Sequence, residues 1–118
     1  MIKKYIRRFP HAIRGIIYAT LNDSSYRHQI YVGTAIILIA LVIFNPLQPF
    51  EFLFIILAWI LILITELQNS AIEAALDRLH PELHESIKQS KDMAAGAVLT
   101  AGLFLLVTLL VIAYSRFI

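Results

Sequence analysis

Five polar side chains directly follow a strongly apolar run in the middle of the chain, and their types and spacing could support chemistry. The stretch ITELQNSAIEAALDRLH places them at Glu66, Asn69, Ser70, Glu73 and Asp77. At about 100° per residue of α-helix, all five share one face. Alanine and leucine occupy much of the remaining surface, and alanine lets a neighbouring helix approach closely. The pattern predicts a carboxylate-rich line that points into a helix bundle.

This polar line is compatible with two kinds of chemistry and with a structural role. Ionisable groups inside membrane helices are costly and are therefore commonly functional. Carboxylates in series could form a proton or ion path. Alternatively, one or two carboxylates could bind Mg²⁺ and another could act as a base in phosphate chemistry. In the third interpretation, the polar groups pair across helices in a non-catalytic membrane subunit, and the spacing alone does not decide among the three.

A second polar segment, SKDM at residues 90–93, could bind phosphate. The pattern predicts that Ser90 caps a helix whose first turn contains Lys91 and Asp92. A helix N-terminus offers free N–H groups to anions, and Lys91 would add a positive charge. An alternative interpretation makes Lys91 an anchor at the membrane surface and Asp92 a residue favoured by the helix dipole. Asp23, in LNDSSYRH, taken by itself is typical of a helix cap.

Membrane helices are the elements that must position these residues. Of 118 residues, 59% are hydrophobic and 15% charged, whereas about a quarter are charged in soluble domains. Three uncharged zones approach the length of roughly 20 residues that a spanning helix needs. They predict transmembrane helices at about residues 28–48, 51–76 and 91–116. The absence of cysteine excludes disulfides and cysteine-based metal sites.

The distribution of basic residues predicts the orientation. The N-terminal segment and the loop after the second predicted span are rich in lysine and arginine, whereas the turn NPLQPF has neither. The positive-inside rule therefore places the N-terminus and that loop in the cytoplasm. Ile13, Ile16, Ile17 and Leu21 recur at helical spacing, which predicts an amphipathic surface helix within residues 1–27. The expected fold is an all-α membrane protein with one surface helix and three transmembrane helices, in a single domain over residues 1–118.

The motif ELQNSAIEAALDR, followed by ELH and SKDMAAGAVL, resembles the prokaryotic diacylglycerol kinase family of small integral membrane kinases, which includes undecaprenol kinases. The resemblance covers nearly the whole chain and is strongest over residues 66–99. It implies ATP- and Mg²⁺-dependent phosphorylation of the hydroxyl of a lipid alcohol. It further implies a homotrimer in the bacterial inner membrane, with shared active sites at the cytoplasmic surface and no nucleic-acid partner.

The resemblance implies roles for individual residues. Glu66 matches the catalytic base that meets the lipid hydroxyl, and Glu73 matches the metal-binding glutamate, which also lies at the nucleotide. Asn69 matches the motif asparagine that positions groups beside them, with Ser70 and Asp77 in support. The nucleotide side is matched by Lys91, Asp92, Glu82 and His84.

Two of the departures from the family pattern lie at predicted site residues. Asp23 stands where the family has a second metal-binding glutamate at the nucleotide, and its side chain is one methylene shorter. His11 stands at a position near the nucleotide that is aromatic in well-known members. The acceptor lipid stays open, because AAGAVL is more similar to undecaprenol kinases and SKDM to diacylglycerol kinases. The sequence contains no Walker A or kinase glycine-rich loop, so phosphate must be held by other means.

Overall fold

Helices make up almost the whole chain in the structure, a computed structural model that describes residues 1–82 and 84–118. They are α1 (Ile2–Asn22), α2 (Ser24–Ile43), α3 (Pro49–Leu79) and α4 (Glu85–Phe117). No strand occurs in the described residues. Three of the helices, α2, α3 and α4, are long and apolar enough to cross a membrane. The predicted all-α class with three spans is therefore confirmed.

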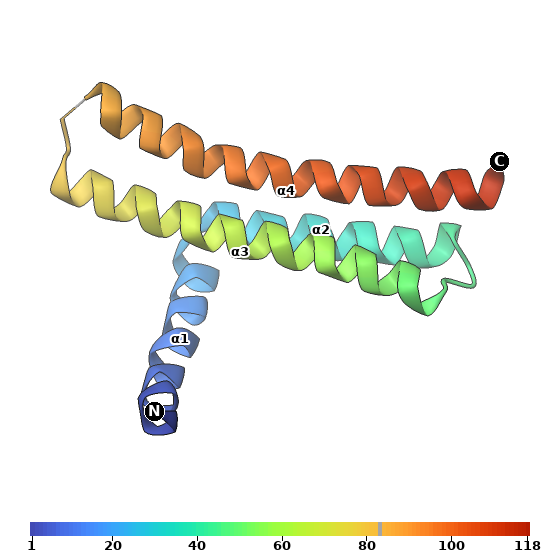
Figure 1. Cartoon of the computed structure of the whole chain (residues 1–118), viewed down its shortest axis with the longest axis horizontal. Helices are drawn as coiled ribbons and strands as arrows, with labels where there is room; N and C mark the ends of the chain where they lie inside the picture. The colour runs from blue at the N-terminus through green and yellow to red at the C-terminus, as the bar shows by residue number, and fades with distance from the viewer. Residues whose placement is uncertain (83) are drawn as a thin grey trace.

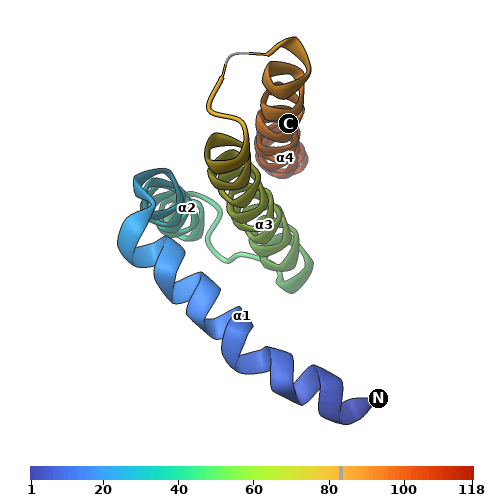
Figure 2. The same ribbon diagram turned by 90° about the vertical axis from the view of Figure 1, so that its left-hand side faces the viewer.

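The three spanning helices lie alongside one another, with α3 between α2 and α4 (Figures 1 and 2). The most extensive packing is between α3 and α4. Their buried contact contains small residues, and Ala58 is completely buried, which allows the two helices to approach closely. The core cluster consists of Ala40, Phe44, Ile55, Ala58, Ile62, Ala101, Leu105 and Ile112.

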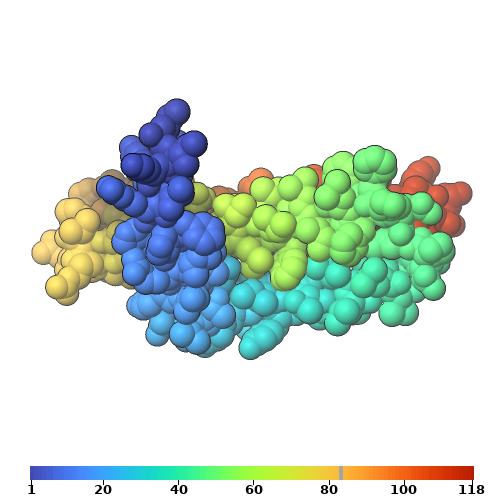
Figure 3. Space-filling model, turned by 90° about the horizontal axis from the view of Figure 1, so that it is seen from below, coloured from blue at the N-terminus to red at the C-terminus, as the bar shows by residue number. Residues whose placement is uncertain are grey.

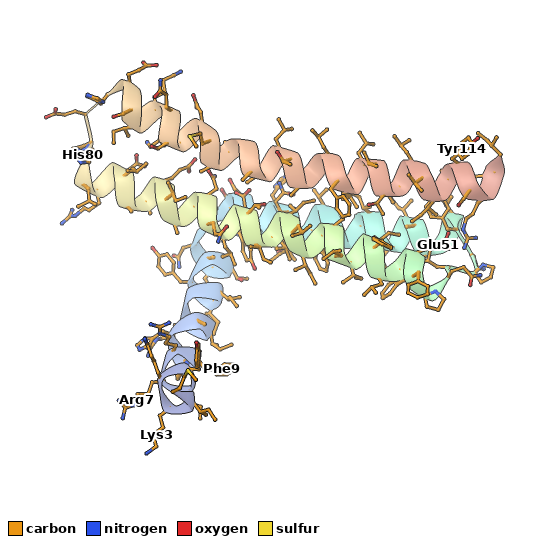
Figure 4. All side chains as sticks on the ribbon, in the orientation of Figure 1. Lys3, Arg7, Phe9, Glu51, His80 and Tyr114 are labelled. Atoms are coloured by element: carbon orange, nitrogen blue, oxygen red, sulfur yellow. The ribbon has the colours of Figure 1, made fainter. Side chains whose placement is uncertain are left out.

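Helix α1 runs across the direction of the other three, near one end of the bundle (Figures 1 and 3). Its basic residues Lys3 and Arg7 lie on the part that is farthest from the bundle (Figure 4). Ile13, Ile16 and Ile17 remain substantially exposed, as suits the apolar face of an interfacial helix. When α2, α3 and α4 span the bilayer, α1 lies along its surface.

The corner between α1 and α2 is earlier than the sequence predicted. Helix α1 ends at Asn22 rather than continuing to residue 27, and α2 begins at Ser24 rather than at residue 28. Asp23 between them has extended backbone, and its Oδ1 accepts hydrogen bonds from the backbone N–H groups of Ser25 (3.0 Å) and Tyr26 (3.3 Å). Asp23 is therefore the N-cap of α2, which ends one helix and starts the next.

The other predicted boundaries also shift. Helix α2 ends at Ile43 rather than at residue 48, and α3 runs from residue 49 to 79 rather than from 51 to 76. The prediction that Ser90 caps the last helix is wrong, because α4 already begins at Glu85. His84 is the N-cap, and its Nδ1 accepts from the N–H of Ser86 at 3.1 Å. The free N–H groups of α4 thus lie about 9 Å before Lys91 along the helix.

Gly33 of α2 allows the indole of Trp59 on α3 to lie directly against the α2 backbone. A Cβ atom at position 33 would overlap Nε1 and Cδ1 of that ring. The ring is held in place because Nε1–H donates to the carbonyl of Gln29 at 3.3 Å. Since the indole cannot yield without breaking this bond, α2 and α3 would have to separate.

We therefore expect Gly33→Ala to destabilise the protein by about 1–3 kcal/mol, although alanine favours helix by about 1 kcal/mol over glycine. The measurement is thermal unfolding in detergent. Gly15→Ala is the matched control, because a Cβ atom there meets nothing within 4 Å. Equal melting temperatures for the two variants would contradict the expected clash.

Arg116 joins the end of α4 to the beginning of α3, at the end of the bundle away from α1. Its guanidinium donates to both carboxylate oxygens of Glu51, with 3.0 Å between Nε and Oε2, and to the carbonyl of Pro46 at 2.6 Å. Its Cζ lies 5.9 Å from the centroid of the Phe44 ring. Both charged side chains are about four-fifths buried, at 20% and 18% exposure. This bidentate pair closes the end of the bundle at which Figure 4 labels Glu51.

Candidate functional site

The polar line on α3 faces two grooves rather than one. Glu66 and Asn69 line a groove of about 480 Å³ that we call the α4 groove; its other lining residues are Gln29, Ala95, Val98, Leu99, Gly102 and Leu103. Ser70, Glu73 and Asp77 line a groove of about 670 Å³ beside α1 and the start of α2, which we call the α1 groove. The five side chains share one face of α3 as predicted, but the neighbouring helices divide that face.

Two hydrogen bonds hold side chains of the polar line in place. The Ser70 hydroxyl donates to Oδ2 of Asp23, which brings the corner between α1 and α2 against α3. At the adjacent residue, Nδ2 of Asn69 donates to Oε1 of Glu73, one turn along α3, at 3.3 Å. Because Asn69 lines the α4 groove and Glu73 the α1 groove, this second bond connects them.

Acceptor oxygens of two residues in the α4 groove have no hydrogen-bond donor in the described residues. Glu66 is 6% exposed and makes no hydrogen bond with residues 1–82 or 84–118. Oδ1 of Asn69 is buried and has no partner in the same described residues. Buried polar atoms are nearly always hydrogen-bonded, and an ionised carboxylate and an amide oxygen both need donors. The pair is therefore suited to receive a hydroxyl group.

The α1 groove holds the two predicted metal ligands, Asp23 and Glu73. Mg²⁺ commonly takes only one or two protein carboxylates and completes its shell with phosphate oxygens and water. The two carboxylates therefore suit Mg²⁺ bound with a nucleotide, although no group of three or more histidine, aspartate or glutamate side chains in the described residues could hold a metal alone. Asp23 already accepts three hydrogen bonds, but an ionised carboxylate has about four acceptor sites.

The predicted nucleotide residues gather in a small pocket between the end of α3 and the start of α4. We call this space of about 150 Å³ the loop pocket; its lining includes Glu82, His84, Lys88, Lys91, Asp92 and Asp77. Nζ of Lys91 forms an ion pair with Asp77, and Lys88 pairs with Asp92 at 3.5 Å. Asp77 lines both this pocket and the α1 groove, so the two spaces adjoin.

The structure does not bring His11 to the other predicted residues. His11 lies on the exposed part of α1, and its Nδ1 contacts the guanidinium of Arg14. Its neighbour Ala12 lines the α1 groove, whereas His11 does not. Conversely, sequence reasoning missed Gln29, which lines the α4 groove beside Glu66. In the sequence, Gln29 is only a single amide at the start of an apolar span, and such residues are too common to predict a site.

Comparison with known proteins identifies the family. The model of the family described as prokaryotic diacylglycerol kinase matches residues 10–113, which include every residue that lines the two grooves and the loop pocket. The diacylglycerol kinase of Escherichia coli (strain K12) is 29% identical over 115 residues, covering 97% of this chain and 92% of that protein. The diacylglycerol kinase of Haemophilus influenzae is 32% identical over 91 residues, with 77% and 75% covered.

A third relative, the diacylglycerol kinase of Synechocystis sp., is 33% identical over 96 residues, which cover 80% of this chain and 54% of that protein. The three apolar helices agree with these matches, since they make the chain a multi-pass membrane protein. The matched residues include the whole polar line of α3. The chain therefore belongs to the prokaryotic diacylglycerol kinase family, and it is a lipid kinase.

Proposed function

We propose that this kinase transfers the γ-phosphoryl group of ATP, with Mg²⁺, to the hydroxyl of a membrane-dissolved lipid alcohol, with diacylglycerol as the first candidate acceptor. The observation that carries the proposal is the position of Glu66 and Glu73 on opposite sides of the contact between Asp23 and Ser70. The corner between α1 and α2 meets α3 at this contact, and α1 would lie at the membrane surface.

The helix rise gives the depths of the two carboxylates. Glu66 precedes Ser70 by one turn, which places it about 6 Å toward the bilayer interior. Glu73 and Asp77 lie on the other side, about 5 Å and 10 Å beyond Ser70. A lipid hydroxyl can therefore reach Glu66 from the bilayer while a nucleotide occupies the α1 groove from the water. Two substrates with opposite solubilities need this separation.

The residues of the α4 groove suit proton removal from the acceptor. The Glu66 carboxylate takes the proton of the lipid hydroxyl, and the resulting oxygen attacks the γ-phosphorus. The bond from the γ-phosphorus to the bridging oxygen of ADP breaks, and ADP leaves. Asn69 is oriented by its bond to Glu73 and lines the same groove as Glu66, so its amide can orient the hydroxyl before transfer.

Phosphoryl transfer depends mainly on positioning and on neutralising charge. Bound Mg²⁺ would neutralise phosphate charge, and Asp23 and Glu73 are the residues that would hold it. Lys91 would leave its ion pair with Asp77 and bind phosphate through its charged side chain. The free backbone N–H groups of α4 would not take part, because they lie at the start of the helix, well before Lys91. Glu82, His84 and Asp92 lie in the same loop pocket and would face the nucleotide.

The proposed setting is the bacterial inner membrane, with basic α1 on the cytoplasmic side. The resemblance to the family supports a homotrimer with shared sites as the working assembly. The relatives reported above carry the name diacylglycerol kinase, which favours diacylglycerol over undecaprenol as acceptor. An ion path has no comparable support, since the apolar run FLFIILAWILILIT separates Glu66 from Glu51.

The test is phosphate transfer from γ-labelled ATP by the purified protein in mixed micelles. Diacylglycerol and undecaprenol are offered separately with Mg²⁺, and the Glu66→Gln variant serves as the blank. Label in diacylglycerol that disappears in the blank supports the proposal as stated. Label in undecaprenol alone would make undecaprenol the acceptor in place of diacylglycerol. Label in neither lipid, with folded protein, would overturn the proposal.

A further inference from the structure

The α4 groove continues past the polar pair into the bilayer. Its α4 side is a stripe at helical spacing, formed by Ala95, Val98, Leu99, Gly102 and Leu103. Helices α3 and α4 are antiparallel and extend side by side from the loop that joins them (Figure 1). At 1.5 Å per residue, Glu66 lies about 20 Å from the loop end of α3, whereas Gly102 lies about 26 Å from the start of α4. The stripe therefore extends about one turn deeper than Glu66.

The two unpaired acceptors indicate what the groove receives. The Glu66 carboxylate belongs to a residue that is 6% exposed, and Oδ1 of Asn69 is buried with no partner in the described residues. Both are acceptors that a hydrogen-bond donor would satisfy, and the deeper stripe is apolar. An occupant that matches both parts has a hydroxyl group attached to a hydrocarbon chain. An apolar helix face from a second copy would cover the stripe but would bring no donor to the carboxylate.

We propose that the α4 groove holds the first part of the acceptor's hydrocarbon chain, and that Gly102 sets how far a chain can extend along α4. This rests on the proposed function, because it assigns the chain of the same lipid whose hydroxyl meets Glu66. Gly102 is thus a specificity-determining residue, and the occupant is a lipid alcohol with an extended chain.

The space at Gly102 makes the proposal testable. A Cβ atom built there meets nothing within 4 Å, so a larger side chain would enter the groove without displacing the core. Glycine is less favourable than alanine inside a helix by about 1 kcal/mol, so Gly102→Leu should not weaken α4. Gly96 has equally open surroundings but does not line the groove, which makes Gly96→Leu the matched control.

The experiment compares the KM for dioctanoylglycerol, dibutyrylglycerol and ATP in both variants. We expect Gly102→Leu to raise the KM for dioctanoylglycerol about tenfold, the scale of a methylene mismatch in an apolar pocket. Only the last carbons of the dibutyrylglycerol chains reach Gly102, whereas the chains of dioctanoylglycerol extend well beyond it. The KM for dibutyrylglycerol should therefore rise much less, and the KM for ATP should not change. Gly96→Leu should behave as the unmodified protein with all three substrates. A KM for ATP and a melting temperature equal to those of Gly96→Leu show that the Gly102→Leu variant is folded.

An unchanged KM for dioctanoylglycerol in Gly102→Leu would overturn the chain site while leaving the kinase proposal intact. An equal rise of the KM for both acceptors, together with a changed pattern of chemical cross-links between subunits, would assign the groove to a second copy. That result would also overturn the chain site. As a readout that needs no variant, a diacylglycerol with a diazirine in its chain should label peptides within residues 95–103. Labelling only outside this range would overturn the site, whereas absence of transfer to any lipid by the unmodified protein would overturn both proposals.

Discussion

Replacement of Glu66 by glutamine should lower phosphoryl transfer by at least about 10²-fold, the lower range for loss of a general base. Glutamine has nearly the same shape but cannot take the proton of the lipid hydroxyl. Glu66 is buried and has no partner in the described residues, so the change breaks no internal contact. The protein should therefore assemble and bind ATP normally. The measurement is kcat with saturating ATP and diacylglycerol, alongside the melting temperature.

Two further variants separate proton transfer from charge or packing. Glu66→Asp keeps the carboxylate but withdraws it by one methylene, so part of the activity should remain. Glu85→Gln makes the same chemical change in the exposed first turn of α4 and should leave kcat unaltered. Normal turnover in Glu66→Gln, or a loss of activity that follows a loss of folded protein, would exclude Glu66 as the base.

Replacement of Glu73 by glutamine should raise the Mg²⁺ concentration needed for half-maximal activity by about tenfold or more. The neutral amide is a poorer ligand than a carboxylate for a hard cation. The measurement is a Mg²⁺ titration of the initial rate at fixed ATP. The hydrogen bond from Asn69 can be kept by the amide oxygen of glutamine, so the α3 face should stay ordered. An unchanged titration would make Glu73 a structural residue that orients Asn69.

Asp23→Asn is the companion variant, because the structure allows charge and capping to be separated there. Asparagine is as good an N-cap as aspartate, so the start of α2 should be preserved, and its amide can still contact Ser70. A shifted Mg²⁺ titration with unchanged melting temperature would support a ligand role for Asp23. An unchanged titration would confine Asp23 to the cap and to the contact with Ser70.

The sequence was most informative where a simple periodic pattern governs structure. Uncharged runs predicted the three spans, and the spacing from Glu66 to Asp77 predicted their common face on α3. The start of α4 was missed because SKDM satisfies a capping pattern locally. No glycine or proline stands between Glu85 and Ser90, so nothing stops the helix from extending back toward Pro81. A capping residue does not start a helix where the preceding residues can also adopt helical structure.

The division of the polar face could not be predicted, because it depends on tertiary structure. Which groove a residue lines is decided by where α1 turns at Asp23 and by how α4 packs on α3. Neither follows from the spacing along α3. The same holds for Gln29, whose importance comes only from the residues opposite it. Hydrophobic periodicity gives the face of a helix, whereas the identity of its neighbours requires the fold.

The ion pair between Arg116 and Glu51 has a consequence for the rotational setting of α4. A bidentate contact tolerates little rotation, and a shift by one residue would swing Arg116 by about 100° around the helix axis. Gly102 precedes Arg116 by about four turns, or about 21 Å, and lies on nearly the same side of α4. Because an α-helix is torsionally stiff over this length, the clamp at one end fixes which α4 residues face Glu66. The far end of the bundle thereby sets the angular alignment of the α4 groove.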